Sequence, residues 1–219
     1  MSETRTSRFF TFDDPQLKTA ILELPAIWWS RPYEYAWACS FAKNNHTVLD
    51  AGCGLCHPFK YYLCNLCSKV YACDLDERLL SKSEVLMDML DVFGNDTLDF
   101  PVSYLEQPIL SIQDISKTSY GSAMFDRIFC ISVLEHLPQE VLFKTLLEFK
   151  RILKKKGLMV ITIDYPYLNL DTFNHMLKKA GLLYADQVDF QLPDNALTTD
   201  LFPEHPGGLY SFRALIKIR

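Results

Sequence analysis

The chain has 219 residues, which is enough for one domain that buries a core without disulfides or metal ions. Its net charge of −5 argues against the broad basic surface of a nucleic-acid-binding protein. No uncharged apolar stretch approaches the roughly 20 residues of a membrane span, and the opening MSETRTSRFF lacks the apolar region of a signal peptide. We therefore expect a single cytoplasmic domain over residues 1–219 with no nucleic-acid or membrane partner. The sequence does not predict an oligomeric state.

Residues 1–45 are rich in aromatic side chains and are expected to form an N-terminal helical cap on a core of residues 46–219. Asp14-Pro15 is a typical helix start, and Pro25 would end that helix. A second helix would begin at Ser30-x-Pro32. Because two adjacent tryptophans cannot both face one core, Trp28 and Trp29, together with Tyr33, are predicted to line an acceptor pocket beside the active site.

The stretch around residue 50 resembles the first unit of a nucleotide-binding α/β fold. Thr47-Val48-Leu49 is a short run with β-forming residues, and Asp50-Ala51-Gly52-Cys53-Gly54 follows it directly. Pro58 suits the start of a helix, so the pattern is strand, glycine turn and helix. Gly52 and Gly54 would let the backbone approach a ligand where a Cβ atom would obstruct it.

The same stretch contains two CxxC pairs, Cys53/Cys56 and Cys64/Cys67, which are also typical of zinc sites. Cys64 lies eight positions after Cys56, a helical rise of about 12 Å, whereas zinc needs each sulfur at about 2.3 Å. One ion could not reach both pairs. We therefore expect no metal and interpret the seven cysteines of the chain as mostly buried thiols of a reduced protein.

Alternating β-like and helical segments follow. Lys69–Asp74 is predicted as a second strand, with Asp74 twenty residues beyond Gly54, near the spacing at which a carboxylate meets ribose hydroxyls. Asp76 would cap a helix that ends at Gly94. The later segments are predicted as strands over Val102–Leu105, Phe125–Ile131 and Leu158–Ile163, helices over Pro138–Leu153 and Leu170–Ala180, and a hairpin of Tyr184–Phe190 with Leu209–Ile218. This order predicts an α/β, Rossmann-like, doubly wound and mostly parallel sheet with a C-terminal antiparallel hairpin strand.

Several of these motifs, in this order, resemble the class I S-adenosylmethionine-dependent methyltransferase family. The resemblance covers roughly residues 45–165 and rests on VLDAGCG, ACDLD, IQDI, FDRIFCISVLEHL and LLEFKRILKKKGLMVIT. It implies that S-adenosyl-L-methionine is the cofactor. Two departures from the family pattern are Cys56 at the third small position of the glycine motif and KKKG in place of a Lys-Pro-Gly-Gly turn.

The resemblance also implies roles for individual residues. Asp50 and the backbone of Gly52, Cys53 and Gly54 would hold the methionine part of the cofactor, and Asp74 would bind the ribose hydroxyls. Asp114 would accept a hydrogen bond from the adenine amino group, with Ile115 and Leu75 against the ring. Cys130 and Ile131 would offer backbone contacts near the sulfonium.

The predicted function is methyl transfer to a small-molecule acceptor. If the acceptor is a hydroxyl, His136 in VLEHL is the expected base, because histidine titrates near neutral pH. His205, in the Pro-rich loop over residues 191–212, is a second candidate for the acceptor pocket. Two alternatives stay open here. One is a protein of the same fold that binds the cofactor without catalysis as a partner subunit. The other is an NAD-dependent oxidoreductase, although that fingerprint wants a third glycine at the position of His57.

Overall fold

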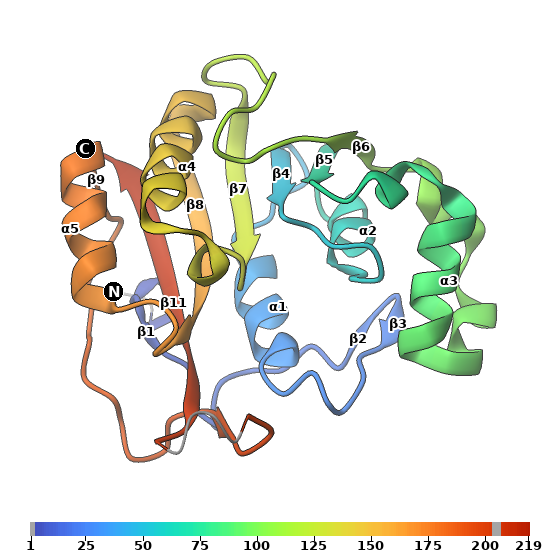
Figure 1. The fold of residues 1–219 in the computed structure, drawn as a ribbon, viewed down its shortest axis with the longest axis horizontal. Helices are drawn as coiled ribbons and strands as arrows, with labels where there is room; N and C mark the ends of the chain where they lie inside the picture. The colour runs from blue at the N-terminus through green and yellow to red at the C-terminus, as the bar shows by residue number, and fades with distance from the viewer. Residues whose placement is uncertain (1–2, 203–206) are drawn as a thin grey trace.

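A computed structural model describes residues 3–202 and 207–219. Their main feature is one nine-stranded sheet with the order β1-β11-β8-β7-β4-β5-β6, in which β9 and β10 also pair with β11 (Figure 1). The parallel strands are β4 (Thr47–Ala51), β5 (Lys69–Asp74), β6 (Ile109–Ile112), β7 (Phe125–Ile131) and β8 (Leu153–Tyr165). The antiparallel strands are β1 (Arg8–Phe9), β9 (Leu182–Tyr184), β10 (Thr198–Thr199) and β11 (Leu209–Ile218). The predicted doubly wound sheet with an antiparallel C-terminal strand is confirmed.

Helices cover both faces of this sheet (Figure 1). On one face lie α4 (Gln139–Ile152) and α5 (Leu170–Ala180), and on the other lie α1 (Arg31–Cys39) and α2 (Phe59–Cys64). The alternation of side chains along β8 explains the two layers. Met159, Ile161 and Ile163 pack under α4 and α5, whereas Leu158 and Val160 pack under α1 and α2. In the part of the chain that the structure describes, no helix has the length and apolarity needed to cross a membrane.

A third group of buried residues lies at the β6 side of the sheet. There α3 (Lys82–Phe93) packs Val85 and Met89 against Tyr61 and Phe100. Short 3-10 turns surround it: η2 (Glu77–Leu80), η3 (Gly94–Asp99) and η4 (Val102–Glu106). Asp76 caps η2 rather than α3, which Ser81 caps, and Gly94 ends α3 as predicted.

The structure corrects two predicted elements. Residues 102–105 form η4 and not a strand, because Pro101 lies at the start of the turn and the third parallel strand begins only after Pro108, as β6. The strand predicted over Leu158–Ile163 is longer, because β8 begins at Leu153 and includes Lys154-Lys155-Lys156, and Lys154 Nζ donates to the Asp126 carboxylate at 2.7 Å.

The N-terminal segment is less helical than predicted. The helix expected from Asp14 to Pro25 is absent, and residues 19–23 form a tight pair of strands, β2 (Thr19–Ala20) and β3 (Leu22–Glu23). The Asp14 carboxylate accepts the Thr11 N–H at 2.9 Å and pairs with Arg8 and Arg213, so it does not cap a helix. Only the helix predicted after Ser30 is present, as α1, besides the short η1 (Glu3–Arg5). β1 adds an edge strand to the main sheet.

Candidate active site

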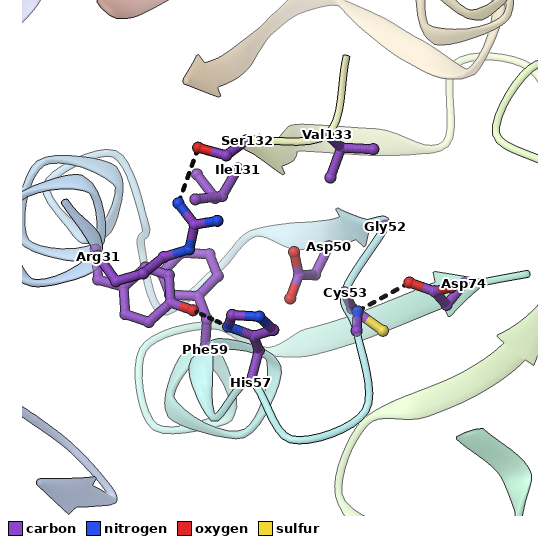
Figure 2. Close-up of a pocket in the computed structure, with 12 residues that line it drawn as sticks. Arg31, Asp50, Gly52, Cys53, His57, Phe59, Asp74, Ile131, Ser132 and Val133 are labelled. Carbon is purple, nitrogen blue, oxygen red and sulfur yellow. Dashed lines mark hydrogen bonds between the residues drawn. The ribbon is translucent and has the colours of Figure 1, made fainter. Parts of the chain in front are cut away.

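A pocket lies at the carboxyl ends of β4, β5 and β7, where ligands bind in sheets of this kind (Figure 2). Its empty volume, which includes space open to solvent, is about 440 Å³. Its lining comes from β4 and the turn after it, the start of α2, the ends of β5 and β7, the turn after β7, and α1: Arg31, Tyr35, Asp50, Gly52, Cys53, Gly54, His57, Phe59, Asp74, Ile131, Ser132 and Val133.

Two glycines shape the turn after β4. Gly52 has φ +74° and Gly54 has φ +58°, a region that residues with a Cβ atom rarely adopt. A Cβ atom on Gly52 would lie 2.7 Å from Val133 Cγ2, and one on Gly54 would lie 2.7 Å from His57 Cδ2. The glycines therefore let this turn pack closely against the turn after β7 and against its own next residues.

A buried lysine stabilises the same turn through hydrogen bonds to its carbonyl groups. Lys60 is fully buried, and its Nζ donates to the carbonyls of Gly54, Leu55 and His57, each at 2.8 Å. These hydrogen bonds satisfy an ammonium that would otherwise be costly to bury. They also fix the carbonyls of Gly54, Leu55 and His57 around one ammonium group.

Two carboxylates at the strand ends differ in their surroundings. Asp50 is 3% exposed, and burial raises its pKa to about 7 although Lys60 opposes the shift. No described residue donates a hydrogen bond to it. Asp74 instead accepts the Gly54 N–H at 2.9 Å and the Asp76 N–H at 3.2 Å. The site thus contains one carboxylate that accepts backbone hydrogen bonds, Asp74, and one that accepts none from the described residues, Asp50.

Helix α1 brings a guanidinium to this edge of the sheet. Arg31 Nη1 donates to Ser132 Oγ at 2.8 Å and to the buried Glu34 carboxylate. Ser132 Oγ also donates to Glu34 at 2.8 Å, and Ser211 Oγ does so at 2.9 Å. Ser132 has φ +49°, which is unusual for a serine and places its hydroxyl in this network. Arg31 is thereby held against the pocket.

An imidazole from the glycine turn faces the same space. His57 Nδ1 lies 2.9 Å from the Tyr35 hydroxyl, and its ring stacks on Trp28 with centroids 4.3 Å apart. Burial, with the charges of Arg31 and Lys60, lowers the pKa of His57 well below 6.5. Burial also raises the pKa of Tyr35 well above 10. Both side chains are therefore neutral near pH 7.

Two further acidic groups lie beside the turn after β7. Glu135 Oε1 accepts the Asp164 N–H at 3.0 Å, while Oε2 has no hydrogen-bond partner among the described residues. Burial raises the pKa of Glu135 to about 8 and that of Asp164 to about 7. These groups and Asp50 concentrate acidic side chains at one edge of the sheet.

The structure brings some of the predicted site residues together and separates others. Asp50, Gly52, Cys53, Gly54, Asp74 and Ile131 line the pocket, whereas Leu75, Asp114, Ile115 and Cys130 do not. Leu75 is 67% exposed, next to Asp74, and Gln113 N–H donates to the Asp74 carbonyl at 3.0 Å. The turn with Asp114 and Ile115 therefore lies beside Asp74, outside the enclosed space. Ile115 and Cys130 are buried in the core under α4.

Among the described residues, the predicted catalytic and acceptor side chains do not line the pocket either. Trp28 comes nearest to it, because its ring stacks on the lining residue His57. His136 is exposed on η5 (Leu134–His136), three residues beyond the lining residue Val133. Trp29 packs against the core between α1, α2 and the sheet, and the buried Tyr33 accepts a hydrogen bond from Gln16 at 2.7 Å. His205 is not among the described residues.

Sequence reasoning missed Arg31, Tyr35, His57, Lys60 and Ser132. The only signal for Lys60 was a charged residue within an otherwise apolar run, PFKYYLC. Arg31 and Tyr35 are separated from the glycine turn by some twenty residues of sequence, so only the packing of α1 places them here. The sequence drew attention to His57 only because it stands where the fingerprint of an NAD-binding protein has its third glycine.

The cysteines form no evident metal centre in the described part of the chain. All seven are free, and Cys53, Cys56, Cys67, Cys73 and Cys130 are buried. No group of three or more potential metal ligands occurs among residues 3–202 and 207–219. The expectation of a metal-free protein stays a prediction.

Comparisons with known proteins agree with this fold. A methyltransferase domain family model matches residues 49–161, more than half of the chain. No curated protein matches. Among solved structures, a TehB-like SAM-dependent methyltransferase from Corynebacterium glutamicum is 17% identical, with a TM-score of 0.56, over 85% of this chain and 87% of that one. Magnesium protoporphyrin IX methyltransferase (ChlM) from Synechocystis, with bound SAM, is 17% identical, with a TM-score of 0.54, over 83% of this chain and 75% of that one.

The [4+2]-cyclase SpnF has the same fold, with 10% identity and a TM-score of 0.64 over 96% of this chain and 86% of that one. Such distant likeness shows the fold alone, because one fold supports several activities. The family match carries the identification. The carboxyl-edge pocket, the two left-handed glycines and the unpaired buried carboxylate Asp50 also fit a zwitterionic nucleoside cofactor. The chain belongs to the methyltransferase domain family and is a class I S-adenosylmethionine-dependent methyltransferase.

Proposed function

We propose that this enzyme methylates a hydroxyl group of a small-molecule acceptor and that His136 is the base. The observation that supports a small acceptor is the flank of this site, where α1 contributes Arg31 and Trp28 stacks on His57 beside the space proposed below for the cofactor. The net charge of −5 offers no broad basic surface, which disfavours a polyanion such as a nucleic acid. We expect the acceptor to enter between the N-terminal segment and the turn after β7.

We also propose a placement for the cofactor. Asp50 and the turn of Gly52, Cys53 and Gly54 would hold its methionine part, and Asp74 its ribose. The exposed Leu75 and the adjacent turn with Asp114 and Ile115 would border the adenine outside the enclosed pocket. Cys130 and Ile131 would contribute backbone near the sulfonium. When bound, the cofactor supplies the electrophilic methyl group, so the protein has to orient the acceptor and remove its proton.

His136 is suited to that proton transfer. Desolvation of the ring and the charge of Arg31 lower its pKa below 6.5, so its free nitrogen is available at pH 7. Its ring centroid lies 6.1 Å from that of Tyr167, on the turn that follows β8. A hydroxyl needs such a base, whereas a neutral amine can attack unaided.

The test is a methyl-transfer screen of hydroxyl, amine, thiol and carboxylate metabolites with the purified protein, followed by His136→Ala. We expect a hydroxyl acceptor, unchanged cofactor affinity, and a loss of about 10²–10⁴ in kcat. His175→Ala is the matched control, because His175 is exposed on α5. Retention of more than about a third of the wild-type kcat would remove His136 as base. Turnover of amines alone would contradict the proposed acceptor class.

A further inference from the structure

The glycine turn of this chain has few backbone donors left for an anionic group. The N–H groups of Gly52 and Cys53 both donate to the Cys73 carbonyl, at 2.9 and 3.0 Å. The Gly54 N–H donates to Asp74 at 2.9 Å. The backbone of Gly52, Cys53 and Gly54 therefore offers an anion no free N–H, so its donors beside these residues have to be side chains.

Arg31 is one such donor. Each hydrogen bond that it makes to a described residue comes from Nη1, to Glu34 and Ser132. The guanidinium has five N–H donors in a fixed plane, so Nε and Nη2 are available. Figure 2 shows the guanidinium beside Ser132, at the border of the pocket that Asp50 also lines. Glu34 holds this orientation, because its buried carboxylate binds Arg31, Ser132 and Ser211 together.

His57 is the second donor, and Tyr35 decides which nitrogen carries its proton. The hydrogen bond joins the Tyr35 hydroxyl to Nδ1. If Nδ1–H donated, the Tyr35 proton would lack an acceptor, since no other described residue bonds to this hydroxyl, which belongs to a residue only 2% exposed. A buried unpaired O–H is costly, so Tyr35 donates to Nδ1 and the proton of the neutral imidazole is on Nε2. The Nε2–H therefore has no partner within the described protein and can donate to a ligand.

These side chains surround one space with complementary charges. Arg31 and His57 supply donors, and the unpaired Asp50 carboxylate supplies a negative acceptor (Figure 2). We propose that Arg31 and the His57 Nε2–H bind the carboxylate of the cofactor's amino-acid end, that Asp50 binds its ammonium group, and that Tyr35 positions His57 by fixing its tautomer. The proposal rests on the placement of the methionine part at Asp50 given above.

The test compares two ligands that differ in the carboxylate alone. Calorimetry measures S-adenosylmethionine and decarboxylated S-adenosylmethionine on the wild-type protein, Arg31→Met and His57→Phe. Wild type should bind the carboxylate-bearing ligand at least tenfold more tightly. Each variant should lower the affinity for S-adenosylmethionine about tenfold and change the affinity for the decarboxylated ligand less than twofold. Arg31→Met leaves the buried Glu34 without its cation and could prevent folding. His57→Phe keeps an aromatic ring against Trp28, so this variant tests the site even in that case. His175→Phe is the control.

Tyr35→Phe tests the positioning role with a readout that packing alone would not change. Nitrogen NMR of histidine-labelled protein should show the Nε2–H tautomer for His57, assigned by its loss in His57→Phe, and a change of tautomer in Tyr35→Phe. Equal wild-type affinity for both ligands, or equal losses for both ligands in the variants, would overturn the carboxylate site and leave the cofactor and acceptor assignments standing. An Nδ1–H tautomer in the wild type would overturn the role of Tyr35. Failure of S-adenosylmethionine to bind the wild type would overturn the cofactor placement itself.

Discussion

At the scale of single residues, the burial of Asp50 bears both on cofactor binding and on the pH dependence of the free energy of unfolding. Its pKa is raised to about 7 in the folded protein, against 3.8 as the ordinary value. The folded state therefore holds a proton that the unfolded state has already lost, and the free energy of unfolding falls as pH rises from about 4 to 7. Since one pKa unit is about 1.4 kcal/mol, the full effect is on the order of 4 kcal/mol.

Asp50→Asn removes this penalty. We expect the variant to be more stable than wild type at pH 8, with the advantage shrinking steadily toward pH 4, and to bind S-adenosylmethionine poorly because the charge is gone. Thermal unfolding across pH 4–8 measures the first effect, and calorimetry measures the second. Asp99→Asn, at an exposed position, is the control and should show no such trend. A pH-independent difference for Asp50→Asn would refute the burial argument.

Asp74 has a double role that its motif alone does not predict. It is expected to bind the ribose, but it also braces the Gly54 N–H at 2.9 Å. Asp74→Ala should weaken binding of S-adenosylmethionine and its demethylated product at least tenfold, through the loss of charge-assisted hydrogen bonds. Asp74→Asn is the control that retains an acceptor for Gly54. If Asp74→Ala binds both ligands with wild-type affinity in calorimetry, Asp74 does not contact the cofactor.

At the scale of elements, the glycine turn depends on its backbone conformation as much as on its side chains. Gly52→Ala has to adopt φ +74° and meet Val133 Cγ2 at 2.7 Å, so we expect a loss of about 1–2 kcal/mol or more in the free energy of unfolding. Cofactor affinity should fall with it. Gly121→Ala is the control, because a Cβ atom there meets nothing within 4 Å. Urea denaturation of the two variants tests the expectation, and equal stabilities would contradict it.

The sequence predicts elements well where one physical signal dominates. β4, β5, β7 and the central part of β8 were predictable, because each contains a short run of apolar, β-forming residues. The strand predicted at residues 102–105 failed because Pro101 and Pro108 made the boundaries ambiguous. Asp14 looked like a helix cap, yet its carboxylate is engaged by arginines from distant strands. Such long-range pairing has no local sequence signal.

The same distinction applies to the site. Asp50, Gly52 and Asp74 belong to one short motif at strand ends, so spacing alone brings them to a common edge. Arg31 and Tyr35 reach that edge only because α1 packs across the sheet. The orientation of His57 depends on Tyr35 and Trp28, which lie in a different element of the fold. Side chains that act through tertiary packing were therefore the ones that pattern reasoning missed.

At the scale of the whole molecule, one ion cluster ties the N-terminal segment to the last strand of the sheet. The Asp14 carboxylate accepts from Arg8 Nη2 at 2.7 Å and from Arg213 Nη1 at 3.1 Å, and Arg213 is 3% exposed. Arg8 lies on β1 and Arg213 on β11, which pair directly. Burial alone would raise the pKa of Asp14, but hydrogen bonds from Arg8 and Thr11 and the arginine charges lower it below 3.8. The segment that carries α1 to the pocket is thus anchored by one carboxylate.

Asp14→Ala leaves Arg213 buried beside Arg8 with no carboxylate between them. Removing one partner of a buried pair is strongly destabilising, so we expect a loss of about 3–5 kcal/mol in the free energy of unfolding at pH 7. Because the folded pKa of Asp14 is lowered, this contribution is present above pH 4 and is lost as pH falls further. The difference between variant and wild type should therefore shrink in acid. Asp13→Ala, at the exposed neighbouring position, is the matched control. If urea denaturation gives the two variants the same stability at pH 7, the N-terminal segment is held by its apolar contacts and not by this cluster.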